Sequence, residues 1–279
     1  MQSKGFLRRL SGEIDGLLRV LWIYLTVGGR FLRWRLQLWL QQSGMVESTQ
    51  TRMKRTLLVI RHGQTTWNVE HRLPGQIPGV TLSDTGRQQV ARLAEALSAL
   101  PLSAIISSPL ERAMQTAEII ANGRNLSIQQ EPGLMDTDVG RWTGQVIDEL
   151  SKNDPAWKEY VRNPTVAPEG IETFPQVQQR VVAAIEQWLT KDDIGSYPVF
   201  VAHADVIKLL LAHYTGLEAG RAGTLMIDNA SVSLVELEKE QRPRVVSIGW
   251  SPHPGWLKPP QLEAPKTADT AQEVGEQKT

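Results

Sequence analysis

The stretch LLVIRHGQTTWN, residues 57–68, places a continuous apolar run directly before an arginine, a histidine and a glycine. Such a run is typical of a strand that is covered on both faces of a sheet, so the sequence predicts a buried strand over residues 56–60. Ligands of parallel α/β sheets bind beyond the carboxyl ends of the strands. Arg61 and His62 would stand at that end, and Gly63 permits a sharp turn or the close approach of a ligand.

Two further buried segments end in the same way. Residues 104–107 (AIIS) are followed by Ser108, which the sequence predicts as the N-cap of a helix with Arg112 in its first turn. Residues 198–202 (PVFVA) run directly into His203. We therefore expect two histidines and two arginines from three strand ends to converge on one pocket.

The segments between these strands have helical periodicity. Helices are predicted from Ser83 onward, over 174–190 and over 206–216, and residues 231–250 are expected to form late strands that include an antiparallel edge. Strands that alternate with amphipathic helices indicate a three-layer α/β/α sandwich around a mostly parallel central sheet.

Composition limits the classes of function. The chain has 279 residues, 30 Lys+Arg and 30 Asp+Glu, so its net charge of zero gives no support to a nucleic-acid partner. It has no cysteine, which excludes disulfides, thiolate catalysis and cysteine-bound metals, and which fits a cytoplasmic protein. The globular domain is expected over 54–256. It is flanked by an N-terminal extension (1–50) and by a disordered tail (257–279) that contains no aromatic residue.

The N-terminal extension is basic and aromatic. Residues 1–44 hold seven basic and two acidic side chains and three of the nine tryptophans. The longest charge-free apolar run, Val20 to Gly29, is shorter than the roughly 20 residues of a membrane span. A helix lying on a membrane surface, a docking helix, and an upstream extension that is not translated (with Met45 or Met53 as the true start) remain three open interpretations.

The predicted pocket has the residue types for phosphoryl transfer. Guanidinium groups hold phosphate bidentately and stay charged at any working pH. A neutral imidazole, favoured by flanking positive charge, can attack phosphorus. These residues indicate transfer of a phosphoryl group to a histidine, with arginines rather than a metal or other cofactor stabilising the charge.

Four blocks of the sequence carry a resemblance. VIRHGQTTWN, SSPLERAMQTA, LMDTDVGRWTG and VAHADVIKLLL resemble, in order, the blocks of the histidine phosphatase superfamily, in its phosphoglycerate-mutase-like branch, over about residues 54–240. The resemblance implies that His62 is phosphorylated, that Arg61 and Arg112 clamp the phosphate, that Asn68 contacts it, and that His203 hydrogen-bonds the transferring group.

The general acid departs from the usual pattern of the family. Asp136 stands where the family commonly has glutamate, and its carboxyl group reaches roughly 1.5 Å less far from the backbone. Asp138 is the neighbouring alternative, and Asp136 could also only order its loop. Glu172, in a segment that resembles the family's Gly-Glu-Ser stretch, is expected to orient a neighbouring arginine or histidine.

Four weaker candidates for lining the substrate come from the same resemblance. Gly75 lies in the loop that usually borders the substrate entrance, and Ala204 replaces the glycine that usually follows the second histidine. Gln64 and Thr65 complete the first loop.

The sequence thus predicts a phosphomonoesterase that hydrolyses a small phosphomonoester in two steps through a phosphohistidine. A phosphomutase would return the phosphoryl group to another hydroxyl instead of water. A non-catalytic module that binds phosphorylated ligands is the alternative from a different class.

Overall fold

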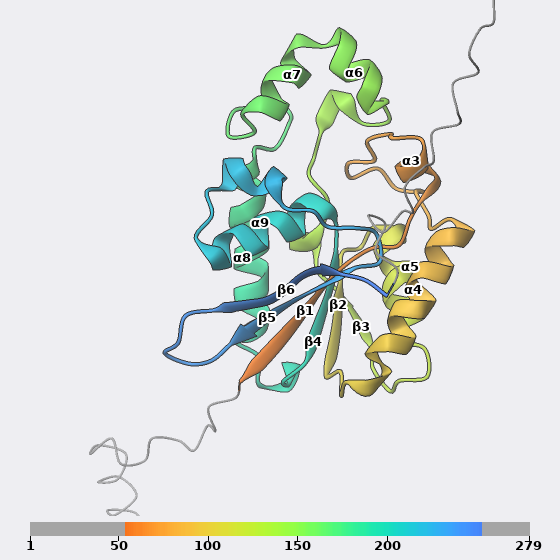
Figure 1. The fold of residues 1–279 in the computed structure, drawn as a ribbon, viewed down its shortest axis with the longest axis vertical. Coiled ribbons are helices and arrows are strands. Elements are labelled where there is room, and N and C mark those ends of the chain that lie inside the picture. The colour runs from red at the N-terminus through yellow and green to blue at the C-terminus, as the bar shows by residue number, and fades with distance from the viewer. Residues whose placement is uncertain (1–53, 253–279) are drawn as a thin grey trace, which may run out of the picture. The chain divides into compact units, whose positions relative to one another are not determined.

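The computed structural model describes residues 54–252, which form a six-stranded sheet with helices on both faces (Figure 1). The strands are β1 Arg55–Arg61, β2 Ala104–Ser107, β3 Ile128–Gln130, β4 Pro198–Ala202, β5 Val232–Leu237 and β6 Arg244–Trp250. The helices are α3 Thr66–Val69, α4 Asp84–Ala96, α5 Glu111–Ala121, α6 Ile147–Asn153, α7 Pro155–Arg162, α8 Phe174–Leu189 and α9 Ala204–Thr215.

The strand order is β3-β2-β4-β1-β5-β6. The pairs β1–β4, β2–β4 and β2–β3 are parallel, whereas β1–β5 and β5–β6 are antiparallel. The predicted α/β class and the predicted antiparallel edge are confirmed. Strand β4 lies between β1 and β2, which brings the carboxyl ends of these three strands to one edge of the sheet.

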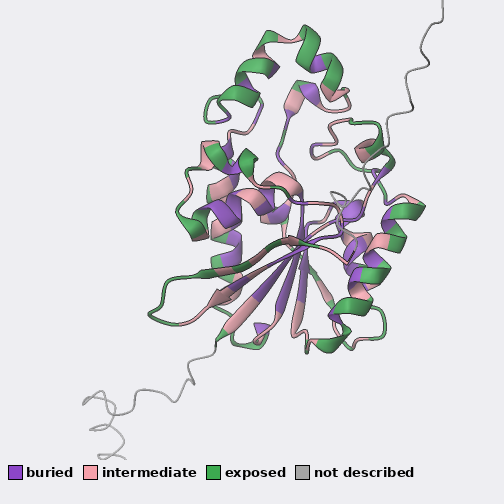
Figure 2. Cartoon of the chain, viewed as in Figure 1, coloured by how far each residue is buried: buried purple, intermediate pink, exposed green. Residues whose placement is uncertain are grey.

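Two apolar layers enclose the sheet. One layer joins side chains of α8 and α9 to the sheet, and the other joins side chains of α4 and α5 to its opposite face. Figure 2 shows the central strands as largely buried and the outer faces of the helices as exposed. Burial on both faces explains why β1, β2 and β4 have continuous apolar sequences rather than alternating ones.

Local sequence signals locate most of the helix starts. Ser83 caps α4 as predicted, its side chain accepting a hydrogen bond from Gly86 N at 3.0 Å. Thr173 caps α8 with a capping box that includes Gln176. Helix α9 begins at Ala204, two residues earlier than the start predicted from its apolar run. Helices α6 and α7, which lie beyond one end of the sheet in Figure 1, and the short strand β3 were not predicted.

Neither terminal segment belongs to the described part of the chain. The predicted N-terminal extension, its membrane contact and the C-terminal tail therefore stay predictions. Within residues 54–252, no helix is both long and apolar enough to cross a membrane.

The loop after β1 packs directly on the first turn of α4 through two glycines. A Cβ atom on Gly86 would lie 2.0 Å from Gln64 O, and one on Gly63 would lie 2.7 Å from Gly86 O. Because both neighbours are backbone atoms, the contact cannot be relieved by a side-chain rotation. The loop that carries His62 is therefore held at a fixed distance from α4.

We expect Gly86→Ala to lower the free energy of unfolding by about 1–3 kcal/mol, since overpacking costs more than the roughly 1 kcal/mol that alanine gains over glycine inside a helix. Urea denaturation measures the change. Gly223→Ala is the matched control, because a Cβ atom there meets nothing within 4 Å. Equal stability of the two variants would contradict the proposed close packing.

Candidate active site

The ends of the three central strands place their following residues side by side. In the sheet register, Arg61 pairs with Ala202, and Ser107 pairs with Val201. His62, Ser108 and His203 come directly after these strands and are all buried. The predicted convergence of strand ends is thus observed.

The two histidine rings face each other across this edge. Their centroids are 5.2 Å apart at an interplanar angle of 56°. His62 Nδ1 lies 2.8 Å from Gly63 O, and a carbonyl oxygen only accepts, so Nδ1 carries the proton. The lone pair of His62 is therefore on Nε2, which has no hydrogen-bond partner among the described residues.

The environment keeps both imidazoles uncharged. Burial, reinforced by the positive charges of Arg112 and Arg61, holds the pKa of His62 well below its usual range. Burial and the charge of Arg112 do the same to the pKa of His203. His62 is therefore an uncharged imidazole at neutral pH, with its Nε2 lone pair available.

Arg112 lies fully buried behind the two rings. Its Nη2 donates to Gly75 O at 2.8 Å and to Asp136 Oδ2 at 3.0 Å. Its Nε and Nη1 have no hydrogen-bond partner among residues 54–252. Gly75, at φ +47°, turns its carbonyl toward this cation.

Arg61 supplies the second guanidinium group. Its Nη1 donates to Ile227 O at 2.6 Å, and its buried Nε has no partner within the described part of the chain. Unsatisfied buried donors each cost about 1–3 kcal/mol. The unsatisfied donors of Arg61 and Arg112 fit an anion held between the two side chains.

Asn68 presents an amide donor to the same cavity. Its Oδ1 accepts from Thr65 N at 3.0 Å, from Thr65 Oγ1 at 3.1 Å and from Asn229 Nδ2 at 3.2 Å. Asn229 Nδ2 also donates to His62 O at 3.1 Å. Because Oδ1 is fully engaged, the orientation of the amide is fixed and its Nδ2 is left for a ligand.

Asp136 reaches the cavity, and Asp138 does not. Oδ2 of Asp136 is 3.6 Å from His203 Nδ1, and Asp136 lines the cavity. Asp138 is exposed, and its side chain accepts from Gly140 N at 2.9 Å. Burial raises the pKa of Asp136 above its ordinary value, and the Asp205 carboxylate adds to this, while Arg112 acts in the opposite direction.

The loop that carries Asp136 is held by an arginine that the sequence did not identify. Arg180 donates from Nη2 to Asp136 O at 2.8 Å and from Nη1 to Met135 O at 2.7 Å. Glu172 pairs bidentately with the same guanidinium, at 2.8 and 2.9 Å, and accepts from Asp138 N. The predicted role of Glu172 in orienting an arginine is confirmed, and that arginine is Arg180.

Ser108 is not the helix cap that the sequence predicted. Helix α5 begins at Glu111 after Leu110, which makes no side-chain cap. The hydroxyl of Ser108 lies 2.9 Å from His203 Nε2 and accepts weakly from Leu110 N at 3.4 Å. A hydroxyl that donates to Nε2 places the His203 proton on Nδ1, where it can donate to a bound oxyanion.

A cavity of about 200 Å³ opens over these groups. Of the predicted residues, Arg61, His62, Asn68, Gly75, Asp136 and Ala204 line it. Arg112 and His203 are fully buried and do not border it directly. Gln64 and Thr65 do not line it either: Gln64 bonds Gln89 and Ser83 through its backbone, and Thr65 uses its hydroxyl to cap α3. The sequence did not predict the other lining residues, which are Arg72, Leu73, Pro74, Thr137, Val139, Ile147 and Asp205.

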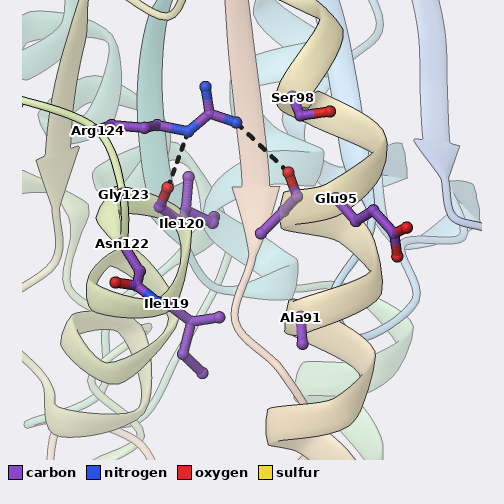
Figure 3. Close-up of a pocket in the computed structure, with 9 residues that line it drawn as sticks. Ala91, Glu95, Ser98, Ile119, Ile120, Asn122, Gly123 and Arg124 are labelled. Carbon is purple, nitrogen blue, oxygen red and sulfur yellow. Dashed lines mark hydrogen bonds between the residues drawn. The ribbon is translucent and has the colours of Figure 1, made fainter.

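A larger groove of about 480 Å³ between α4 and α5 lacks this chemistry (Figure 3). Its lining contains no histidine. Its cation, Arg124, donates to Ile120 O at 3.0 Å and to Ala94 O at 3.4 Å, which ties the two helices together. The smaller cavity at the strand ends is therefore the candidate active site.

Comparison of the sequence with known proteins identifies the family of this chain. The family model of the histidine phosphatase superfamily (branch 1) matches residues 57–251. A relative described as a probable phosphoglycerate mutase, GpmB, of Cronobacter sakazakii is 33% identical over 195 residues, which are 69% of this chain and 88% of the relative.

Solved structures resemble this chain in fold. A mycobacterial glucosyl-3-phosphoglycerate phosphatase in complex with VO3 superposes with a TM-score of 0.65 at 29% identity, over 71% of this chain and all of the other. Bacillus stearothermophilus YhfR superposes with a TM-score of 0.65 at 33% identity, over 70% of this chain and 96% of the other. Together with the model that matches most of the globular part, these likenesses show that the chain belongs to the histidine phosphatase superfamily, branch 1.

Proposed function

We propose that the protein is a phosphomonoesterase that transfers the phosphoryl group of a small phosphomonoester to His62 and then to water. The observation that carries the proposal is the uncharged, oriented imidazole of His62, which borders the cavity, faces a second histidine and lies within the field of two arginines that have buried, unsatisfied donors. The likeness to a phosphatase of the same superfamily supports it.

In the first step, His62 Nε2 attacks phosphorus and the bond from phosphorus to the ester oxygen breaks. The Nδ1 hydrogen bond to Gly63 O holds the ring and stabilises the positive charge that develops on it. Arg61, Arg112 and Asn68 bind the phosphoryl oxygens, and His203 donates from Nδ1 to the same group. Their charges and dipoles are positioned before the reaction, which is the main source of such stabilisation.

Asp136 gives its proton to the departing alkoxide oxygen. Burial raises the pKa of Asp136 above its ordinary value, which favours the protonated form that a general acid requires. In the second step the same carboxylate accepts a proton from water, which attacks phosphorus and breaks the bond to His62. Inorganic phosphate leaves, and no step calls on a metal ion.

A phosphomutase is the second candidate, because the relative from Cronobacter sakazakii bears the name of a mutase. The phosphohistidine is common to both reactions, and only the acceptor differs: a hydroxyl group of the bound ester in the mutase, and water in the phosphatase.

His62→Gln is expected to lower kcat/KM for p-nitrophenyl phosphate by about four orders of magnitude or more, because the nucleophile is lost. Labelled phosphate from a labelled monoester should be trapped, acid-labile, on wild type and not on the variant. His213→Gln, an exposed histidine near the end of α9, is the matched control and should retain full activity. Full turnover by His62→Gln would refute the mechanism, and tight phosphate binding without trapping would favour a non-catalytic binding module.

Asp136→Asn should lower kcat for an alkyl phosphate by about 10²–10⁴ and should affect p-nitrophenyl phosphate much less, since p-nitrophenolate departs without a proton. The wild-type rate on the alkyl ester should fall as pH rises through the raised pKa of Asp136, and this alkaline limb should vanish in the variant. Asp138→Asn is the control. If that variant shows the loss instead, Asp138 is the acid.

Product analysis separates the two candidate reactions. With 3-phosphoglycerate as the substrate, we expect net release of inorganic phosphate without accumulation of the 2-phospho isomer, as followed by ³¹P NMR. Accumulation of the isomer ahead of phosphate would assign the protein as a mutase.

A further inference from the structure

The cavity holds charged side chains that the proposed reaction does not use. Once Arg61 and Arg112 have bound the phosphoryl group and Asp136 serves as the acid, the remaining charged residues of the lining are Arg72 and Asp205. Both line the same cavity as His62 and Asp136, so the alcohol portion of the ester can meet them. Their hydrogen bonds decide which of them can meet the substrate.

The charge of Arg72 is already paired, and two of its nitrogens donate hydrogen bonds. Its Nε donates to Glu70 Oε2 at 3.1 Å, and its Nη1 donates to Gly144 O at 2.6 Å. Its guanidinium also lies 5.6 Å from the centre of the Trp67 ring. These contacts give Arg72 a carboxylate partner and hold it against the wall of the cavity, where it connects the loop after α3 to the segment before α6.

Asp205 retains an acceptor. Its Oδ1 accepts from Lys208 Nζ at 3.2 Å, whereas its Oδ2 has no hydrogen-bond partner among residues 54–252. The side chain is 37% exposed. Its negative charge acts across the cavity, since it contributes to the raised pKa of Asp136.

The rest of the lining offers few polar contacts. Leu73, Pro74, Val139 and Ile147 form an apolar wall. A second anionic group on the substrate would therefore meet the carboxylate of Asp205, while the remaining cation of the lining, Arg72, is already paired with Glu70. A hydroxyl or ammonium group would instead donate to Oδ2.

We propose that Asp205 selects the leaving group, favouring an alcohol that carries a further hydroxyl or ammonium group over one that carries a carboxylate or a second phosphate. This inference rests on the proposed phosphomonoesterase activity and narrows its substrate class. Like-charge juxtaposition is a common means of rejecting a competing ligand. Asp205 also lies in the first turn of α9, where a carboxylate stabilises the helix, so the test must separate selection from stability.

A matched pair of substrates isolates the charge of the leaving group. Glycerol 3-phosphate and 3-phosphoglycerate both have three carbons and carry their phosphate on a primary alcohol. They differ at the opposite end, which is a hydroxymethyl group in the first and a carboxylate in the second. The wild type is expected to favour glycerol 3-phosphate in kcat/KM by about tenfold or more, the scale of one like-charge contact in a partly solvated site. p-Nitrophenyl phosphate serves as the reference substrate.

Asp205→Asn should reduce this preference severalfold, with Asp205→Ser as the second variant should the first fail to fold. Asp205→Glu, which keeps the charge, should retain most of it. Asp192→Asn removes the same charge from an exposed carboxylate before β4, at the opposite end of the sheet, and should leave the preference unchanged. Thermal denaturation of each variant reports the contribution of the residue to helix stability.

Two results would overturn the proposal. A wild type that prefers 3-phosphoglycerate, or has no preference, would assign this part of the cavity to Arg72. A lower melting temperature of Asp205→Asn with an unchanged preference would limit Asp205 to stabilising α9. In both cases turnover of p-nitrophenyl phosphate that depends on His62 would leave the phosphatase assignment intact, whereas absence of that turnover would refute the assignment and the inference together.

Discussion

The site is organised around the buried positive charge of Arg112. A guanidinium group without access to solvent is costly unless its charge is paired and its donors are satisfied. Here one nitrogen binds both Gly75 O and the Asp136 carboxylate, while Nε and Nη1 stay unsatisfied among the described residues. One cation therefore connects α5 to two distant loops and keeps two donors available for an anion.

Burial, together with the charges of Arg112 and Arg61, shifts the protonation states of the histidines and of Asp136. Burial together with Arg112 and Arg61 lowers the pKa of His62, so its Nε2 lone pair is available at neutral pH. Burial raises the pKa of Asp136 against the opposing effect of Arg112. The site thus favours a bound oxyanion, an uncharged His62 and the protonated form of Asp136. The proposed transfer of a phosphoryl group to histidine requires all three.

A further arginine, Arg180, fixes the position of the loop that carries Asp136 and does not line the cavity. Arg180 of α8 binds backbone oxygens on both sides of the Met135–Asp136 peptide bond and pairs with Glu172. This contact holds the backbone from which the Asp136 carboxyl group reaches to within 3.6 Å of His203 Nδ1.

Several features failed to follow from local rules. Ser108 has the residue type and the spacing of an N-cap, yet its hydroxyl meets His203, 95 positions along the chain. The contact with a buried imidazole replaced the local cap. Strand β3 has a single apolar residue in three, and α6 is short and mostly exposed, so no periodic signal marks them. Helix α7 does carry a signal, since Asp154 caps it and Trp157 and Tyr160 are buried on one face, but the pattern spans only eight residues.

The sequence by itself determined the α/β class, the positions of the three central strands and the placement of Arg61, His62, Arg112 and His203 at their ends. Apolar runs, helical periodicity and turn residues act over a few neighbours and can be read locally. Only the tertiary structure placed Asp136 rather than Asp138 at the cavity, brought Asn229 and Arg180 to the site, kept Gln64 and Thr65 out of the lining and placed Asp205 within it. Those outcomes depend on contacts between segments far apart in the chain, and the side chains that make them carry no local signature.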